Sequence, residues 1–139
     1  MSDVSKFVCS ICLSVISSVA GAEVVAVVSA KSSVASLSKD QVSDIFLGKA
    51  ATYPGGGQAV PIEQAEGAQR DAFHSKVTGK DSTKLRAYWS RQIFSGTGNP
   101  PKEVPDAAEM KKLVAANTNM IGYLDKGAVD ASLKVVLTP

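Results

Sequence analysis

The sequence predicts an α/β fold, a single domain in which a mixed sheet of about four strands packs with four helices. Five successive apolar residues, Val24 to Val28, are typical of a strand that is buried on both faces of a parallel or mixed sheet. Behind this run, segments with apolar residues at helical spacing follow or precede short apolar runs. The predicted order is strand, helix, strand, helix, helix, helix, strand, strand, which indicates a layered α/β arrangement.

The composition supports one folded domain and excludes some classes of function. The chain has 139 residues, of which 45% are apolar and 20% charged, so it resembles ordinary globular proteins rather than disordered ones. Its net charge is only +2, and no cluster of basic residues is present. We therefore expect no nucleic acid among its partners.

The first 22 residues have the pattern of a signal peptide. An uncharged run of 13 residues, Phe7 to Val19, follows Lys6 and precedes Ala20-Gly21-Ala22. Small residues at positions −3 and −1 before Glu23 suit a signal peptidase. A membrane anchor is the alternative, but a membrane span needs about 20 apolar residues. The sequence predicts a signal peptide at 1–22, a single domain at 23–139, a periplasmic or secreted location, and no membrane span after cleavage.

Two cysteines form a CxxC motif within the same apolar run. Cys9 and Cys12 have no second cysteine pair with which to complete a zinc site. We interpret them as part of the signal peptide, so neither a metal nor a redox site is predicted from them.

The first helix of the domain is predicted from its cap and its apolar face. Ser38 and Gln41 form a capping-box pair, and Gly48 is a typical residue after a helix end. The apolar face consists of Val42, Ile45 and Phe46. A glycine-rich loop follows, in which Tyr53 is predicted to be an exposed aromatic residue.

The stretch from Ala59 to Phe73 predicts a strand, a turn at Gly67 and the start of a helix that ends near Val77, before Gly79. A helix N-terminus offers unpaired N–H groups and partial positive charge, both of which favour an anion. Arg70 could add a charged, forked donor. From the spacing alone, an ordinary strand-to-helix connection carrying a solvated arginine is the favoured interpretation.

Two further helices and two strands complete the predicted domain. The third helix begins at Asp81 or Ser82 and ends at Gly96, with an apolar stripe of Leu85, Tyr88, Trp89 and Ile93. A loop without regular structure is predicted for residues 96–105, because this segment is rich in Gly and Pro. The fourth helix is capped by Asp106 with Glu109 and has an apolar face of Met110, Leu113 and Val114. The last two strands cover residues 121–124 and 133–137.

The sequence does not predict an enzyme. His74 is the chain's one histidine and is interpreted as a surface residue, because adjacent Ser75 cannot face it on a helix. No nucleotide-binding or nucleophile-elbow motif is present. We expect no catalytic residues, no metal site and no cofactor.

Three segments resemble one known family. The segment Val42 to Lys49 contains IFLGK, and Ile121-Gly122-Tyr123 gives IGY; both resemble segments of the substrate-binding proteins of phosphate ABC transporters. The segment Arg86 to Gly96, with Pro100-Pro101, resembles a small single-lobe branch of that type II periplasmic-binding-protein superfamily. The resemblance implies a single lobe of this fold, because a full receptor closes two lobes on its ligand.

The resemblance also implies a binding site. The family's phosphate-binding segment corresponds to the turn that precedes the second helix, and Gly67 matches its first glycine. Three positions differ from the family's segment: Ala68 replaces a hydroxyl donor, Gln69 replaces a glycine, and Arg70 replaces a threonine. The implied ligand-binding residues are Glu66, Gly67, Ala68, Gln69 and Arg70, and the implied ligand is phosphate or a similar small anion.

Two functions are therefore predicted as alternatives. The first is a solute-binding module whose further partners, by resemblance, are a transporter permease or another periplasmic protein. The second is a protein-interaction module on the same fold that has lost small-molecule binding. The loops around Tyr53 and from Asn99 to Lys102 are the predicted contact surface of that second alternative.

Overall fold

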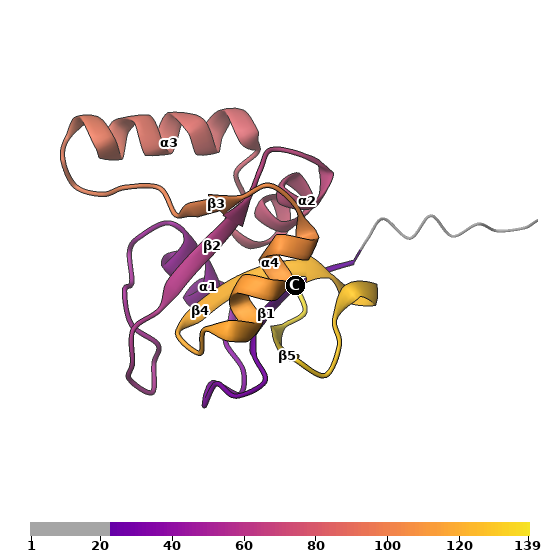
Figure 1. The fold of residues 1–139 in the computed structure, drawn as a ribbon. Helices are drawn as coiled ribbons and strands as arrows, with labels where there is room; N and C mark the ends of the chain where they lie inside the picture. Colours follow the sequence, from indigo (N-terminus) through magenta and orange to yellow (C-terminus); the bar gives the residue numbers. More distant parts are fainter. Residues whose placement is uncertain (1–22) are drawn as a thin grey trace, which may run out of the picture.

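The computed structural model describes residues 23–139 (Figure 1). The predicted signal peptide, with Cys9 and Cys12, lies outside the described residues. Five strands, four α-helices and one short 3-10 helix follow in this order: β1 (Val24–Ser29), α1 (Lys39–Phe46), β2 (Val60–Gln64), α2 (Ala68–Val77), α3 (Ser82–Phe94), β3 (Lys102–Val104), α4 (Ala107–Ala116), β4 (Met120–Asp125), η1 (Lys126–Ala128) and β5 (Leu133–Leu137).

The strands form one mixed sheet in the order β3-β2-β4-β1-β5. Strand β1 pairs antiparallel with both β4 and β5, whereas β2 pairs parallel with both β3 and β4. All six residues of β1 are buried, as its unbroken apolar run predicts. The predicted α/β class and mixed sheet are thus confirmed.

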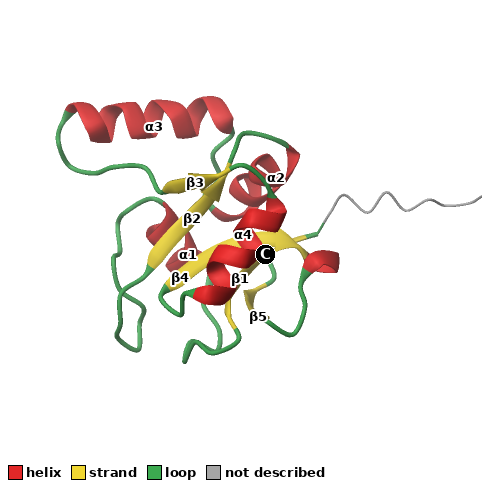
Figure 2. Ribbon diagram, viewed as in Figure 1, coloured by secondary structure: helices red, strands yellow, loops and turns green. Residues whose placement is uncertain are grey.

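Helices cover both faces of this sheet, and two neighbouring residues of β4 demonstrate it. The Cα of Gly122 faces α4, where a Cβ would lie 3.0 Å from Val114 Cγ2. The next side chain, Tyr123, points to the opposite face, where its ring stacks on Phe73 of α2 at a centroid distance of 4.2 Å and lies 5.9 Å from Phe46 of α1. Alternate residues of a strand face opposite sides. Helix α4 therefore covers one face, and α1 with α2 covers the other (Figure 2).

The predicted helix ends agree with the structure. Ser38 caps α1 in a complete capping box with Gln41, Asp81 caps α3, and Asp106 caps α4. Gly48, Gly79 and Gly96 follow α1, α2 and α3 with positive φ angles of 75°, 71° and 71°. This conformation costs glycine little and other residues more, so these ends are encoded locally.

Helix α3 lies apart from the main core, along the upper edge of the molecule in Figure 1. Its buried residues Leu85 and Trp89 pack with Leu47 in a separate small cluster. The predicted stripe is wrong at one position, because Ile93 is 53% exposed. Phe94, the last residue of the helix, is 95% exposed.

Two further expectations are corrected by the structure. The segment 96–105 contains a strand, β3, because its residues 102–104 pair with Ile62, Glu63 and Gln64 at the edge of the sheet. Tyr53 is buried, and its hydroxyl donates to the carbonyl of Asn119 at 3.0 Å. Within residues 23–139, no helix has the length and apolar character needed to cross a bilayer.

Candidate functional site

The N-terminus of α2 is open, because no side chain caps it. Strand β2 ends at Gln64, and Gly67 is the N-cap residue of α2 with extended backbone angles and no capping side chain. The N–H groups of a first helical turn have no partners within their own helix. The end of β2 therefore leads directly to unpaired backbone donors, a geometry that suits a small anion.

Gln64 fixes the turn between β2 and α2. Its side-chain Nε2 donates to the carbonyl of Tyr123 and to Gln69 Oε1, each at 3.0 Å. The backbone N–H of Ala65 donates to the carbonyl of Val104 at 2.9 Å. Contacts to β4, α2 and β3 thus hold the turn in place.

Arg70 lies in the first turn of α2 and folds back toward the sheet. Its side chain is only 14% exposed. Its Nη1 donates at 3.0 Å both to the carbonyl of Gln64 and to Glu103 Oε2. Its Nε is buried and has no hydrogen-bond partner in the described part of the chain. An unpaired buried donor is costly, so this nitrogen is a candidate for contact with a bound acceptor or water.

Glu66 and Arg86 form a second ion pair at the same place. Arg86 Nη2, on α3, donates to Glu66 Oε1 at 2.7 Å, and both side chains are more than half exposed. The hydrogen bond and charge of Arg86 hold the pKa of Glu66 below its usual value. Glu66 is consequently ionised at neutral pH and can only accept hydrogen bonds.

These four charged side chains line one open hollow of about 460 Å³. Its lining consists of Glu66, Arg70, Arg86, Trp89, Ser90, Ile93, Pro100 and Glu103. Residues from α3 form one wall, and residues from α2 and β3 form the other. The lining therefore combines apolar residues with positively and negatively charged side chains.

A buried polar cluster joins β2, β4 and α2. Glu63 of β2 accepts a hydrogen bond from the hydroxyl of Tyr123, and its Oε2 lies 2.8 Å from His74 Nε2. His74 Nδ1 lies 3.0 Å from Thr78 Oγ1. His74 is only 1% exposed, so its interpretation as a surface residue was wrong.

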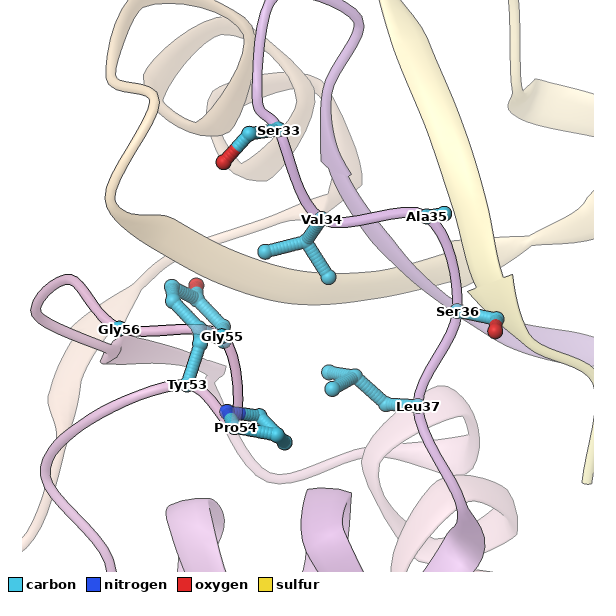
Figure 3. Close-up of a pocket in the computed structure, with 9 residues that line it drawn as sticks. All are labelled: Ser33, Val34, Ala35, Ser36, Leu37, Tyr53, Pro54, Gly55 and Gly56. Carbon is cyan, nitrogen blue, oxygen red and sulfur yellow. The ribbon is translucent and has the colours of Figure 1, made fainter.

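A second hollow, of about 370 Å³, lies between the loop that follows β1 and the loop that precedes β2 (Figure 3). The side chains of Val34, Leu37 and Tyr53 converge in it, and Ser33 and Ser36 lie at its rim. It contains no charged side chain among its lining residues. Residues 23–139 also contain no group of three potential metal ligands.

No protein-family model and no curated protein matches the chain. Solved structures do match it. A putative phosphate ABC transporter substrate-binding protein with bound phosphate, from Clostridium perfringens, aligns with a TM-score of 0.65 and 25% identity, over 82% of this chain and 44% of its own. An ABC-type phosphate transport receptor from Vibrio cholerae gives 0.65 and 20%, over 82% and 45%. PstS from Borrelia burgdorferi gives 0.60 and 9%, over 82% and 46%.

The chain has the fold of phosphate ABC transporter substrate-binding proteins. It spans less than half the length of each of these phosphate-receptor structures, in agreement with the single-lobe fold that the sequence predicts. Two of the proteins that share this fold are described as a substrate-binding protein and a transport receptor.

Within this phosphate-receptor fold, the five predicted site residues do not all face the same space. Glu66 and Arg70 line the charged hollow, whereas Gly67, Ala68 and Gln69 are not among its lining residues. Gln69 pairs with Gln64, and Gly67 and Ala68 contribute the open start of α2.

Sequence reasoning missed several residues of this site. Arg86, Trp89 and Glu103 belong to α3 and β3, which are distant from the turn in sequence. A weak signal was available for Glu63, a charged residue within a strand that is otherwise apolar on that side. Nothing in the spacing pairs it with His74, because their contact depends on how α2 packs against β2.

Proposed function

We propose that this chain is a periplasmic or secreted solute-binding module that holds phosphate or a similar small anion where β2 meets α2. The observation that carries the proposal is the uncapped start of α2 beside two arginine side chains. The fold supports it, because proteins of the same fold are described as phosphate-binding, one of them with bound phosphate.

The donors and acceptors of the site limit the charge state of the ligand. The first N–H groups of α2 and the guanidinium of Arg86 attract an oxyanion. Glu66 and Glu103 line the hollow together with Arg86 and oppose a fully ionised anion. An ionised carboxylate accepts a hydrogen bond, so an oxyanion that retains a proton fits this site better than one without.

The open geometry limits affinity. The hollow lies on the surface of a single lobe, and the side chains of Glu66 and Arg86 are 56% and 64% exposed. Water and salt weaken charge interactions at such exposure. We therefore expect weak binding that decreases as the ionic strength rises.

Calorimetric titration of residues 23–139 with phosphate and with sulfate tests this proposal. Arg86→Gln should abolish or strongly reduce the heat of binding, because it removes a charged donor of the hollow. The matched control is Arg91→Gln, on the same helix but outside the hollow lining. Absence of heat and of a thermal shift at millimolar phosphate and sulfate would overturn the proposal.

The location is tested separately. A reporter enzyme that is active only after export should gain activity when fused behind residues 1–22 followed by the start of the domain. N-terminal sequencing of the exported fusion should begin at Glu23 if the predicted cleavage site is used. Retention of an intact N-terminus in the membrane would support the anchor alternative instead.

One observation favours a protein-interaction module as the second candidate. Phe94 is 95% exposed and its neighbour Ile93 is 53% exposed, at the end of a helix that lies apart from the core. Asn99 and Lys102, in the predicted contact segment, are exposed nearby in the chain. A protein that remains monomeric at high concentration, with no change in behaviour after Phe94→Ser, would contradict this alternative.

A further inference from the structure

The charged hollow between α2, α3 and β3 contains equal numbers of positive and negative side chains. Arg70 is paired with Glu103 at 3.0 Å, and Arg86 is paired with Glu66 at 2.7 Å. A ligand that carries only negative charge would approach two carboxylates as it approached the two arginines. A ligand that carries both charges can instead separate such a pair, because its negative group can then contact the arginine and its positive group the glutamate.

The exposed pair is the one that a ligand can open. Glu66 and Arg86 are both more than half exposed, so their attraction is weakened by water. Arg70 is held more firmly, because its Nη1 also bonds the carbonyl of Gln64. The hollow thus has one pair that can separate and one cation that stays fixed.

The hollow also has an apolar side that an inorganic anion would leave uncovered. Trp89, Ile93 and Pro100 line it, and Ile93 remains 53% exposed to solvent. Its volume of about 460 Å³ falls within the range of sites that enclose organic molecules, roughly 300–1,000 Å³. Covering exposed apolar surface favours binding, so a ligand with an apolar body gains a contact that phosphate lacks.

We propose that the hollow binds a small zwitterion with an apolar body, such as an amino acid with an aliphatic side chain. This inference rests on the proposed solute-binding function and assigns to the hollow a second class of solute, besides small anions. The ligand's carboxylate lies beside Arg86 and Arg70, and its ammonium group lies beside Glu66 and Glu103. The aliphatic part covers Ile93 and Pro100, the exposed apolar residues of the lining.

Four ligands with matched chemistry test this proposal on residues 23–139. Leucine carries both charges and an aliphatic body; isocaproate is the same body without the ammonium group, and isoamylamine is the same body without the carboxylate. Glycine carries both charges without the body. Titration near neutral pH at low ionic strength should show leucine binding at least about tenfold more tightly than each of the other three.

A variant of one carboxylate gives an independent test. Glu103→Gln removes a negative charge but retains an acceptor for Arg70. It should weaken leucine binding by about tenfold and leave isocaproate binding unchanged or tighter, because only leucine has an ammonium group. The matched control is Glu109→Gln, an exposed residue of α4 outside the hollow lining, which should alter neither ligand.

The outcomes separate this inference from the function on which it rests. Phosphate binding without leucine binding overturns the zwitterion proposal and leaves the anion site standing. Equal binding of leucine and isocaproate has the same consequence. Absence of binding by phosphate, sulfate and leucine overturns both. If Glu103→Gln does not fold, the comparison of the four ligands on the unmodified chain still decides.

Discussion

The hydroxyl of Tyr123, on β4, donates a hydrogen bond to the buried carboxylate of Glu63, on β2. The same hydroxyl oxygen accepts the backbone N–H of Gln64 at 3.1 Å. The carbonyl of Gln64 in turn accepts from Arg70, at the edge of the charged hollow. A continuous set of hydrogen bonds therefore joins the buried centre of the domain to its candidate site.

Replacing Tyr123 with Phe should destabilise the domain by about 1–3 kcal/mol, because it leaves a buried carboxylate oxygen and a buried N–H without their partner. Urea unfolding followed by circular dichroism measures this loss. The control is Tyr88→Phe, which removes a hydroxyl that donates to the carbonyl of Leu47 in a half-buried position. A smaller loss for Tyr123→Phe than for Tyr88→Phe would contradict the role assigned to the buried cluster.

Replacing His74 with Phe should cost about 3 kcal/mol of unfolding free energy, since it leaves Glu63 Oε2 without the nitrogen that lies 2.8 Å away. The rings of Phe46 and Phe73 surround His74, so an aromatic replacement fits the space. The double variant with Glu63→Leu should recover part of the loss, because it removes the unpaired carboxylate as well. If the double variant loses as much free energy of unfolding as the two single variants together, the pair is not coupled.

The domain should lose stability at alkaline pH, with a contribution from Tyr53. Burial raises the pKa of the Tyr53 hydroxyl to about 12, whereas an unfolded tyrosine has a pKa of about 10. Because the folded state holds the proton more tightly, this contribution is fully present below about pH 10 and is lost as the pH rises toward about 12.

The variant Tyr53→Phe isolates this contribution. Between about pH 9 and about pH 11, the unmodified domain should lose roughly 1 kcal/mol more unfolding free energy than Tyr53→Phe does. The hydrogen bond to Asn119 is missing from the variant at both pH values, so the difference between the two losses reports the titration alone. Equal losses in the two proteins would contradict the prediction.

Replacing Gly122 with Ala should destabilise the domain by about 1–3 kcal/mol through overpacking. A Cβ there would overlap the sulfur of Met110 and lie 3.0 Å from Val114 Cγ2, both on α4. Gly55→Ala is the control, because nothing lies within 4 Å of its added Cβ. Thermal unfolding compares the two variants. In the double variant Gly122→Ala with Met110→Ala, the loss of stability should be smaller than the sum of the two single losses, because the smaller residue at 110 leaves room for the added Cβ. A loss equal to that sum would indicate another cause.

Local sequence was sufficient for most elements. Three local signals each act within a few residues: the four valines and one alanine of β1, the capping box at Ser38 and Gln41, and the glycines that end three helices. Their effects depend on backbone conformation and on burial of an apolar face, so reading the chain in order predicts them. The IGY segment is explained instead by tertiary packing: Ile121 lies in the core, Gly122 leaves room for α4, and Tyr123 hydrogen-bonds Glu63.

Long-range packing decided the parts that sequence reasoning missed. Strand β3 has only three residues and follows two prolines, and it forms because β2 offers an unpaired edge. The candidate site was anticipated at Glu66 and Arg70, but their partners Arg86 and Glu103 come from α3 and β3. The sequence by itself determined the α/β class, the order of the main elements and the open start of α2. Only the tertiary structure decided which charges meet there, because ion pairs and buried hydrogen bonds join residues that the chain brings together only after its helices pack on the sheet.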